Sequence, residues 1–461
     1  MKISGFLISV FIFLLAYQTS PAQDDYIKWL QKEQEKFQKF IDEEDKKFVE
    51  FLRKEWREVL LEKGIPSFQE PKPIEPPKLI DKVKKGNNEI KVIPPSRPDN
   101  QYDLDENKKS QPEIKRVEEK PEKDITLEPP KEPSVVKEAN MLSAEIEFYG
   151  VSINYSYKDN LRIKLKGKLN KETIADFWEA LSASDYKDFL QQALSIKSKM
   201  QLNDWGYLLL LNSMAERVYP DLQNEKTLFI WFMLVKSGYL ARVGYFENKV
   251  NLLIASNNLL FEIPYLILND QSARFYRIAL DEKSKLDLRK IYTYSGEHSS
   301  TAKVFEFNLK KYPNFNSEYG KREISFSFNK KNYVINLEYD LSAIRFFEKY
   351  PHTEYPIYFS TGMSNKAKEN LLNNLKPHIE NKSEYEAVNF LLHFVQKATE
   401  YKTDKEQFGR EKPLFPEESL YYKFSDCEDR AILFSYLVSN LLNLNVIGLK
   451  FPNHVATAVK F

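Results

Sequence analysis

A long proline-rich stretch divides this chain and limits what its N-terminal part can fold with. Residues 65–138 contain 13 of the 23 prolines in the 461-residue sequence, set among lysines and glutamates with few large apolar side chains. Such a segment cannot bury enough apolar surface to offset the entropy of ordering it. We therefore predict a disordered linker over residues 65–138, extended by its prolines.

The first residues have the pattern of an export signal. Lys2 precedes an apolar run from Ile3 to Tyr17, and small residues around Ala22 suit cleavage after it. The run is too short for a comfortable membrane span, which takes about 20 residues, and no other segment approaches that length. We predict a signal peptide over residues 1–22 and an exported protein, periplasmic or secreted, without a transmembrane span.

An internal repeat follows the signal. The strings DYIKWLQKEQE, KFQKFIDEEDK and KFVEFLRKEWR fill residues 25–57 without a gap, so apolar side chains recur every eleven residues. Eleven residues make about three helical turns at 3.67 residues per turn, which places these side chains on one stripe. The pattern predicts a long amphipathic helix over residues 24–64, ended by Gly64 and Pro66. Such a helix either docks on the protein's own globular part or self-associates as a coiled coil, or it binds a dedicated protein partner.

Composition excludes several classes of partner. The 68 lysines and arginines balance 67 aspartates and glutamates, so no basic excess favours nucleic acid or an anionic membrane surface. A lone cysteine in an exported chain cannot form an internal disulfide. No metal-ligand cluster, phosphate-binding loop or cofactor motif is recognisable, so we expect neither a metal nor a cofactor.

The globular part mixes helical and strand patterns. Residues 139–290 predict strands, four helices and further strands, and residues 300–362 predict a β-meander. Helical patterns resume in residues 363–461, where SEYEAVNFLLHFVQKATEY has one apolar face. The fold class predicted is α+β.

The single cysteine lies at the predicted start of a helix. In KFSDCEDRAILFSYLV, Ser425 and Glu428 form the capping-box pattern directly before an apolar run. This predicts Ser425 as the N-cap and Cys427 near the second helical residue, where unpaired backbone N–H groups favour the thiolate. Asp426, Glu428 and Asp429 disfavour a second anion in the same turn, so the thiol needs a cationic partner.

His454 is the histidine that we expect beside this thiol. It begins the second of two predicted strands after the cysteine helix, and this order returns the strand's start towards the helix N-terminus. Cys427 and His454 could then form a thiolate–imidazolium pair. His352 and His378 follow prolines and are expected to be exposed, and His393 lies on a helix face.

The stretches DCEDRAILFSYLV and LNVIGLKFPNHVATAVKF resemble the core of the transglutaminase-like superfamily, cysteine enzymes related in architecture to papain-like proteases. The resemblance covers residues 383–461, and YKTDKEQFGREKPLFPEESLYYKFSD resembles the run-in of exported bacterial members. It implies a transglutaminase-like domain over residues 363–461. It also implies Cys427 as the nucleophile, His454 as the general base and Asp429 as the family's accompanying acid.

The chain departs from the family pattern near the site. Ser425 stands where many members have glycine, and Val455 and Ala456 stand where many have an aromatic residue. The family's third catalytic group is an Asp or Asn on the next strand, but the sequence ends seven residues after His454. We therefore expect a truncated version of a longer protein, poorly active and with an unpaired sheet edge.

A second copy of this plan precedes the first by about 203 residues, in NEKTLFIWFMLVKSGYLARVGYFENKVNLLIAS. Asn224 takes the position of Cys427, and Val250 or Asn251 takes that of His454. We predict a degenerate transglutaminase-like domain within residues 139–290 that supports or recognises rather than reacts. The alternative is an ordinary α+β domain with the same element order.

Two functions follow from these patterns. The first is an exported cysteine enzyme that acts on peptide or protein amides, by hydrolysis or by acyl transfer to an amine. The alternative is a non-catalytic scaffold or binding protein of the cell envelope, in which transglutaminase-like folds bind partners.

Overall fold

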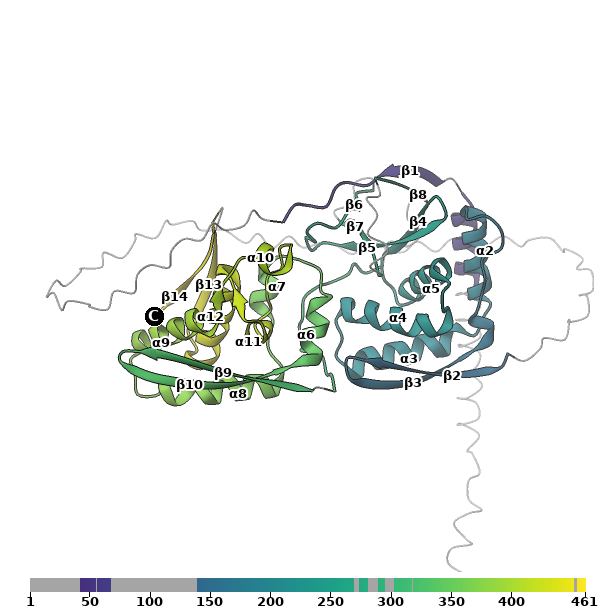
Figure 1. Ribbon diagram of the computed structural model, residues 1–461. Coiled ribbons are helices and arrows are strands. Elements are labelled where there is room, and N and C mark those ends of the chain that lie inside the picture. Colours follow the sequence, from purple (N-terminus) through teal and green to yellow (C-terminus); the bar gives the residue numbers. More distant parts are fainter. Residues whose placement is uncertain are drawn as a thin grey trace, which may run out of the picture. The chain divides into compact units, whose positions relative to one another are not determined.

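The structure, a computed structural model, describes residues 42–54, 56–67, 139–268, 273–280, 289–294, 302–316, 318–451 and 454–461. The predicted signal peptide, the first part of the repeat and nearly all of the predicted linker lie outside these ranges. The described residues belong to one unit that combines helices with antiparallel strands (Figure 1). The predicted α+β class is confirmed at this level.

A six-stranded antiparallel sheet organises the first half of the described chain. Its strand order is β1-β8-β4-β5-β7-β6. The strands are β1 (Trp56–Leu60), β4 (Ala241–Phe246), β5 (Lys249–Ser256), β6 (Tyr265–Leu266), β7 (Arg274–Ile278) and β8 (Lys290–Tyr294). Strand β5 is buried along nearly its whole length, as its apolar sequence requires of a central strand.

The sheet curls until the chain after β1 reaches the opposite edge. Glu62 and Tyr265 exchange backbone hydrogen bonds of 2.7 and 3.3 Å, so the segment that begins beside β8 also pairs with β6. Gly64 lies at this seam, where a Cβ would be 2.3 Å from the Glu262 carbonyl carbon. Only glycine allows this close approach of two backbones.

The N-terminal helix is shorter than predicted. Residues 42–52 are helical, but residues 56–60 form strand β1, so the prediction of a helix through residue 64 is wrong. The apolar stripe continues only at Val59, because the next positions of its other two columns hold Glu62 and Lys63, and residues 56–60 pair with β8 instead.

The helical residues 42–52 are docked on the globular part. Phe48 and Leu52 are buried in the main core, and the Phe48 ring lies 4.5 Å from that of Trp178. Lys236 donates a hydrogen bond to Asp45 and forms an ion pair with it. The sequence left open whether this helix docks on the protein's own globular part. Residues 42–52 do so in the structure.

Four helices and a hairpin cover the sheet. They are β2 (Met141–Phe148), β3 (Val151–Lys158), a 3₁₀ turn (Asp159–Leu161), α2 (Lys171–Ser182), α3 (Tyr186–Lys199), α4 (Asp204–Val218) and α5 (Gln223–Lys236). Helix α5 packs on β4 and β5, while α3 and α4 pack on the β2–β3 hairpin (Figure 1). The sequence predicted these four helices.

The second half of the described chain is built on a long hairpin and α-helices. Its elements are β9 (Tyr319–Phe328), β10 (Lys331–Asp340), α6 (Leu341–Glu348), α7 (Tyr355–Ser360), α8 (Asn365–Leu375), a 3₁₀ turn (Lys376–His378), α9 (Glu384–Ala398), β11 (Glu400–Tyr401), α10 (Asp404–Phe408), α11 (Glu418–Tyr421), β12 (Phe424–Ser425), α12 (Cys427–Leu442), β13 (Asn445–Phe451) and β14 (His454–Lys460). Helix α9 packs on β9 and α8 on β10, and α12 contacts α9, β13 and β14.

The predicted meander over residues 300–362 is correct only for the β9–β10 hairpin. The chain turns helical directly after β10, because the Asp340 side chain caps α6 by accepting hydrogen bonds from the N–H groups of Ser342 and Ala343. Helix α7 follows within the same predicted segment.

A helix followed by an antiparallel hairpin occurs twice. Helix α5 precedes β4 and β5, and α12 precedes β13 and β14. The closing pairs of the two hairpins are Phe246 with Lys249 and Phe451 with His454. In the first of these helix–hairpin units, β8 and β7 extend the sheet on both sides of the β4–β5 hairpin. In the second, β13 and β14 pair only with each other among the described residues.

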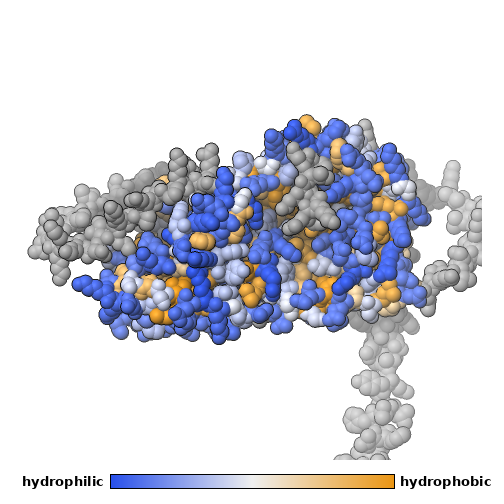
Figure 2. Space-filling view, viewed as in Figure 1, coloured by the Kyte–Doolittle hydropathy of each residue, from blue (hydrophilic) through white to orange (hydrophobic). Residues whose placement is uncertain are grey.

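The face drawn in Figure 2 is predominantly hydrophilic, with small separate apolar areas. Two exposed apolar side chains, Ile447 and Phe451, lie on β13. No helix among the described ranges combines the length and the apolar character that a membrane crossing needs.

Candidate functional site

Ser425 does not cap helix α12. It belongs to strand β12, where it pairs with Tyr401 of β11. Its hydroxyl group bonds to that of Thr399 and accepts a hydrogen bond of 3.2 Å from Arg430 Nε. The predicted cap is therefore wrong, because strand pairing and these side chains engage Ser425 before the helix begins.

The helix begins one residue later than predicted, with Asp426 as its N-cap. The capping box joins Asp426 and Asp429, and not Ser425 and Glu428. The sequence contains both patterns in overlap, and the structure uses the second. Cys427 is consequently the first residue of the helix. Glu428 does not take part in the capping box, and its side chain contacts the thiol instead.

The thiol of Cys427 is partly buried and has two polar contacts. It donates a hydrogen bond of 3.1 Å to Glu428 Oε2. The sulfur lies against the backbone N–H of Val455 in β14. Burial raises the pKa of this thiol, and the Val455 N–H acts in the opposite direction. The pKa is thus raised, not lowered as the helix-terminus argument predicts.

His454 precedes Val455, the residue whose N–H lies against the sulfur, but its imidazole makes no hydrogen bond to the thiol. Among the described residues, the structure contains no hydrogen bond between His454 and Cys427. Val455 is 6% exposed and faces the interior, whereas His454 is half-buried. Successive side chains of a strand point to opposite faces. The imidazole therefore projects from the other face of the hairpin.

Asp429 fixes the backbone around the helix start. Its Oδ1 accepts a 2.7 Å hydrogen bond from the N–H of Leu414, and its Oδ2 accepts one of 3.3 Å from the N–H of Asp426. It makes no hydrogen bond to Cys427 or His454. Burial, followed by the charge of Asp426, raises the pKa of Asp429 well above its usual value. The family role inferred for this acid stays a prediction.

The first helix–hairpin unit repeats the main contact without a thiol. Asn224 Oδ1 accepts a 2.9 Å hydrogen bond from the N–H of Val250, as the Cys427 sulfur lies against that of Val455. Each valine is the second residue of its strand. Asn224 therefore corresponds to Cys427, as the sequence predicts, but Lys249, and neither Val250 nor Asn251, corresponds to His454.

A pocket of about 810 Å³ shares two residues with the surroundings of the thiol, although Cys427 itself does not line it. Helices α7, α8 and α12 and strand β13 contribute to its walls, which include Tyr355, Phe359, Met363, Tyr436, Lys450 and Val455. Two of these residues connect it to Cys427. Val455 contacts the sulfur through its N–H, and the Cys427 charge is one of several that, after burial, raise the pKa of Tyr355. Val455 and Tyr355 are therefore the residues through which the pocket adjoins the surroundings of the thiol.

Buried carboxyl groups surround the start of α12. In the described part of the chain, Asp404, Glu411, Asp426, Glu428 and Asp429 are the acidic side chains that could hold a cation here. The sequence shows that Asp426, Glu428 and Asp429 share one turn, but Asp404 and Glu411 join them from a separate segment without motif spacing.

No family model, no curated protein and no solved structure matches this chain. The transglutaminase-like resemblance accordingly depends on the residues quoted for it above.

Proposed function

We propose that this chain is an exported, cysteine-dependent enzyme that acts on peptide or protein amides through Cys427, by hydrolysis or acyl transfer. The position of the thiol carries the proposal. It occupies the first residue of α12, against the N–H group of Val455 in β14, and Val455 also lines a pocket of about 810 Å³. The resemblance of residues 383–461 to the transglutaminase-like superfamily supports the same role.

The reaction begins with loss of the thiol proton. Glu428 Oε2, at 3.1 Å from the sulfur, accepts the hydrogen bond of the thiol and could accept its proton. His454 is the base that the resemblance implies, although no hydrogen bond joins its imidazole to the sulfur. Both residues are therefore candidates for the general base.

The sulfur then attacks the amide carbon and forms a tetrahedral intermediate. Free N–H groups of the first turn of α12 stabilise its oxyanion, because helix N-termini offer unpaired donors. Collapse breaks the C–N bond, and the amine leaves with the proton taken from the thiol. Water or a second amine attacks the thioester and restores the thiol.

Turnover by single variants tests the proposal. Using a set of peptide amides, we expect Cys427→Ala to abolish turnover. Replacing the residue that acts as base, by His454→Ala or Glu428→Gln, should lower kcat by about 10²–10⁴-fold. His378→Ala is the matched control, because this histidine packs on Tyr333 away from the site. Equal turnover by the wild type and Cys427→Ala would remove the proposed nucleophile.

The binding-protein alternative has its own support. The thiol pKa is raised by burial, and the imidazole of His454 makes no hydrogen bond to it. On this alternative, peptides bind in the pocket without turnover, and Cys427→Ala binds them as well as the wild type does. Peptide binding measured by calorimetry, in parallel with turnover, separates the two functions.

A further inference from the structure

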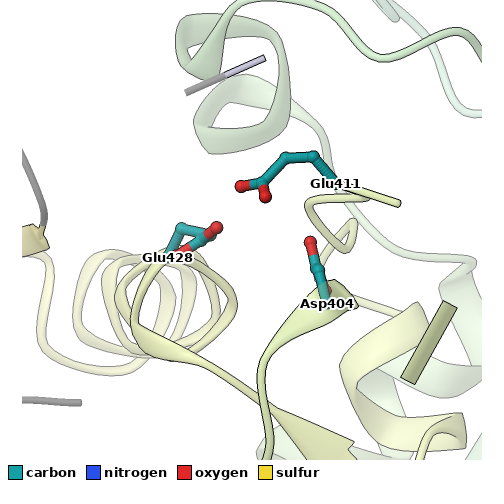
Figure 3. A group of neighbouring side chains, drawn as sticks. All are labelled: Asp404, Glu411 and Glu428. Atoms are coloured by element: carbon teal, nitrogen blue, oxygen red, sulfur yellow. The ribbon is translucent and has the colours of Figure 1, made fainter. Parts of the chain in front are cut away.

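Five buried carboxyl groups lie together at the start of α12. Asp404, Glu411, Asp426, Glu428 and Asp429 are 2%, 6%, 1%, 0% and 1% exposed. They come from the start of α10, the segment after it and the first turn of α12. One oxygen each of Asp404, Glu411 and Glu428 lies within 4.8 Å of the others. Figure 3 shows these three carboxylates pointing towards a common space.

Other buried acids in the same half of the chain are fully satisfied. Glu417 is 0% exposed, yet its two oxygens accept four hydrogen bonds of 2.5–2.8 Å. Glu418 is equally buried and pairs with Lys412 at 2.5 Å, while the N–H of Phe415 donates at 3.0 Å. These two buried carboxylates are therefore stabilised by hydrogen-bond donors or by a paired lysine.

In the group at α12, Asp404 and Asp429 accept backbone hydrogen bonds, but Glu428 and Asp426 break this pattern. Glu428 Oε2 receives only the thiol proton, and Glu428 Oε1 is buried with no hydrogen-bond partner, as is Asp426 Oδ1. Within the described ranges, no basic side chain forms an ion pair with Asp404, Asp426, Glu428 or Asp429. Buried oxygens without donors are costly, and adjacent carboxylates repel one another. Arg430 and Lys412 are near enough for their charges to oppose the rise in the pKa of Asp426 and Asp429, respectively, but neither forms an ion pair with them.

We propose that a hard divalent cation, best matched by Ca²⁺, binds between Asp404, Glu411 and Glu428. Ca²⁺ takes oxygen ligands at about 2.3–2.6 Å, so ligands on opposite sides of one ion are roughly 4.6–5.2 Å apart. The three oxygens lie within 4.8 Å of one another, no farther apart than the ligands of one such ion can be. An all-carboxylate donor set favours hard ions over soft ones. Asp426, in the same turn as Glu428, is placed to add an oxygen.

This site differs from the expectation of no metal, and it does not depend on Cys427 being a nucleophile. Its ligands are seven and seventeen residues apart along the chain, a spacing that matches no metal motif. A bound ion would join α10 and the segment after it to the first turn of α12. It would thereby stabilise the helix start that positions the thiol.

Thermal unfolding of the chelator-treated full-length chain tests the site. At a Ca²⁺ concentration about 100 times the Kd, we expect Tm to rise by roughly 5 °C or more. Glu428→Gln should abolish this rise without lowering Tm in the absence of Ca²⁺, because it removes a repelling charge. Glu384→Gln, an exposed change of the same charge on α9, is the control and should respond to Ca²⁺ as the wild type does.

Tb³⁺ luminescence provides a second measurement that does not depend on stability. Tyr355 and Tyr401 lie near enough to the group for the Glu428 and Asp426 charges to contribute to their raised pKa values, after burial. Both tyrosines can therefore sensitise Tb³⁺ bound there. We expect emission that Ca²⁺ displaces, with at least a tenfold higher apparent Kd in Asp404→Asn. The proposal is overturned if the wild type responds to neither Ca²⁺ nor Tb³⁺, or if Glu428→Gln responds to them as the wild type does. It is also overturned if Zn²⁺ is the only ion that raises Tm and Cys427→Ser removes that rise.

Discussion

His352 is a buried base that the sequence led us to expect at the surface. It is 7% exposed, its ring lies 4.7 Å from that of Phe261, and neither ring nitrogen has a hydrogen-bond partner. A bend after Pro351 does not expose it, because the N–H of Phe261 donates to the His352 carbonyl oxygen and brings the phenylalanine ring over it. Burial first, and then the charges of Arg410 and Lys450, lower its pKa to about 3.

This histidine makes the protein sensitive to acid. In the unfolded chain a histidine has a pKa of about 6.5, so below that pH the unfolded state binds a proton that the folded state refuses. Its contribution to stability is therefore present above about pH 6.5 and is lost as pH falls towards 3. At pH 4.5 the loss should be about 2–3 kcal/mol. Urea unfolding at pH 7 and 4.5 measures it.

His352→Leu isolates this effect from the carboxyl groups. The variant should lose less stability than the wild type between pH 7 and 4.5, because it has no base to protonate at that position. His378→Leu, at a half-buried ring, is the matched histidine control. An identical pH dependence in the wild type and His352→Leu would contradict this account.

Single residues also show where sequence patterns stop deciding structure. The stretch SDCED contains two overlapping capping boxes, and the choice of Asp426 over Ser425 depends on the pairing of β12 with β11, a tertiary contact. The direction of the His454 side chain depends on which residue of β14 meets the helix. Neither property is local, so the sequence predicted the neighbourhood of the site and not its contacts.

At the scale of elements, the amphipathic helices were predictable because each carries its own apolar face. Helices α2 to α5 and α9 follow their patterns closely. The structure of residues 42–60 was not predictable, because β1 forms by pairing with β8, which is far away in the sequence. The helical repeat therefore gives way to a strand where residues 56–60 pair with the edge of the sheet.

The docking of residues 42–52 leads to a stability prediction. Leu52 is 0% exposed in the main core. Leu52→Ala should destabilise the protein by about 2–5 kcal/mol, because it leaves a cavity. Lys46→Ala, an exposed change in the same helix, should alter stability by less than about 0.5 kcal/mol. Thermal or urea unfolding of both variants gives the comparison, and equal stabilities would show that this helix does not belong to the core.

At the scale of the whole described unit, Glu417 joins four segments. It accepts hydrogen bonds from Tyr312, from the N–H of Asp340 at the end of β10, and from both the hydroxyl and the N–H of Ser364 before α8. Its own position is the N-cap of α11. One buried carboxylate thus connects segments that are far apart in the sequence.

Removing that carboxylate should destabilise the protein strongly. Glu417→Ala leaves several buried donors unpaired, each costing about 1–3 kcal/mol, so the total should reach at least about 3 kcal/mol. Tyr312→Phe removes only one of the bonds and should cost about 1 kcal/mol. Urea unfolding of both variants tests this order. A smaller effect for Glu417→Ala than for Tyr312→Phe would contradict the connecting role.

The duplicated helix–hairpin plan was visible in the sequence because it depends on element order. The structure adds the contact that the two copies share, from Asn224 to Val250 and from Cys427 to Val455. The group of carboxylates could not be predicted, since residues 404, 411 and 428 meet only after the chain has folded around α12.

The central claim is that Cys427 is a nucleophile, and trapping an acyl-enzyme tests it most directly. The folded protein is mixed with p-nitrophenyl acetate, quenched in acid and examined by intact and peptide mass spectrometry. We expect one acetyl group per chain, located on Cys427, formed at least about tenfold faster than on the urea-unfolded chain. An acetyl group found elsewhere, or labelling of Cys427 no faster than in the unfolded chain, would contradict the claim and favour the binding protein.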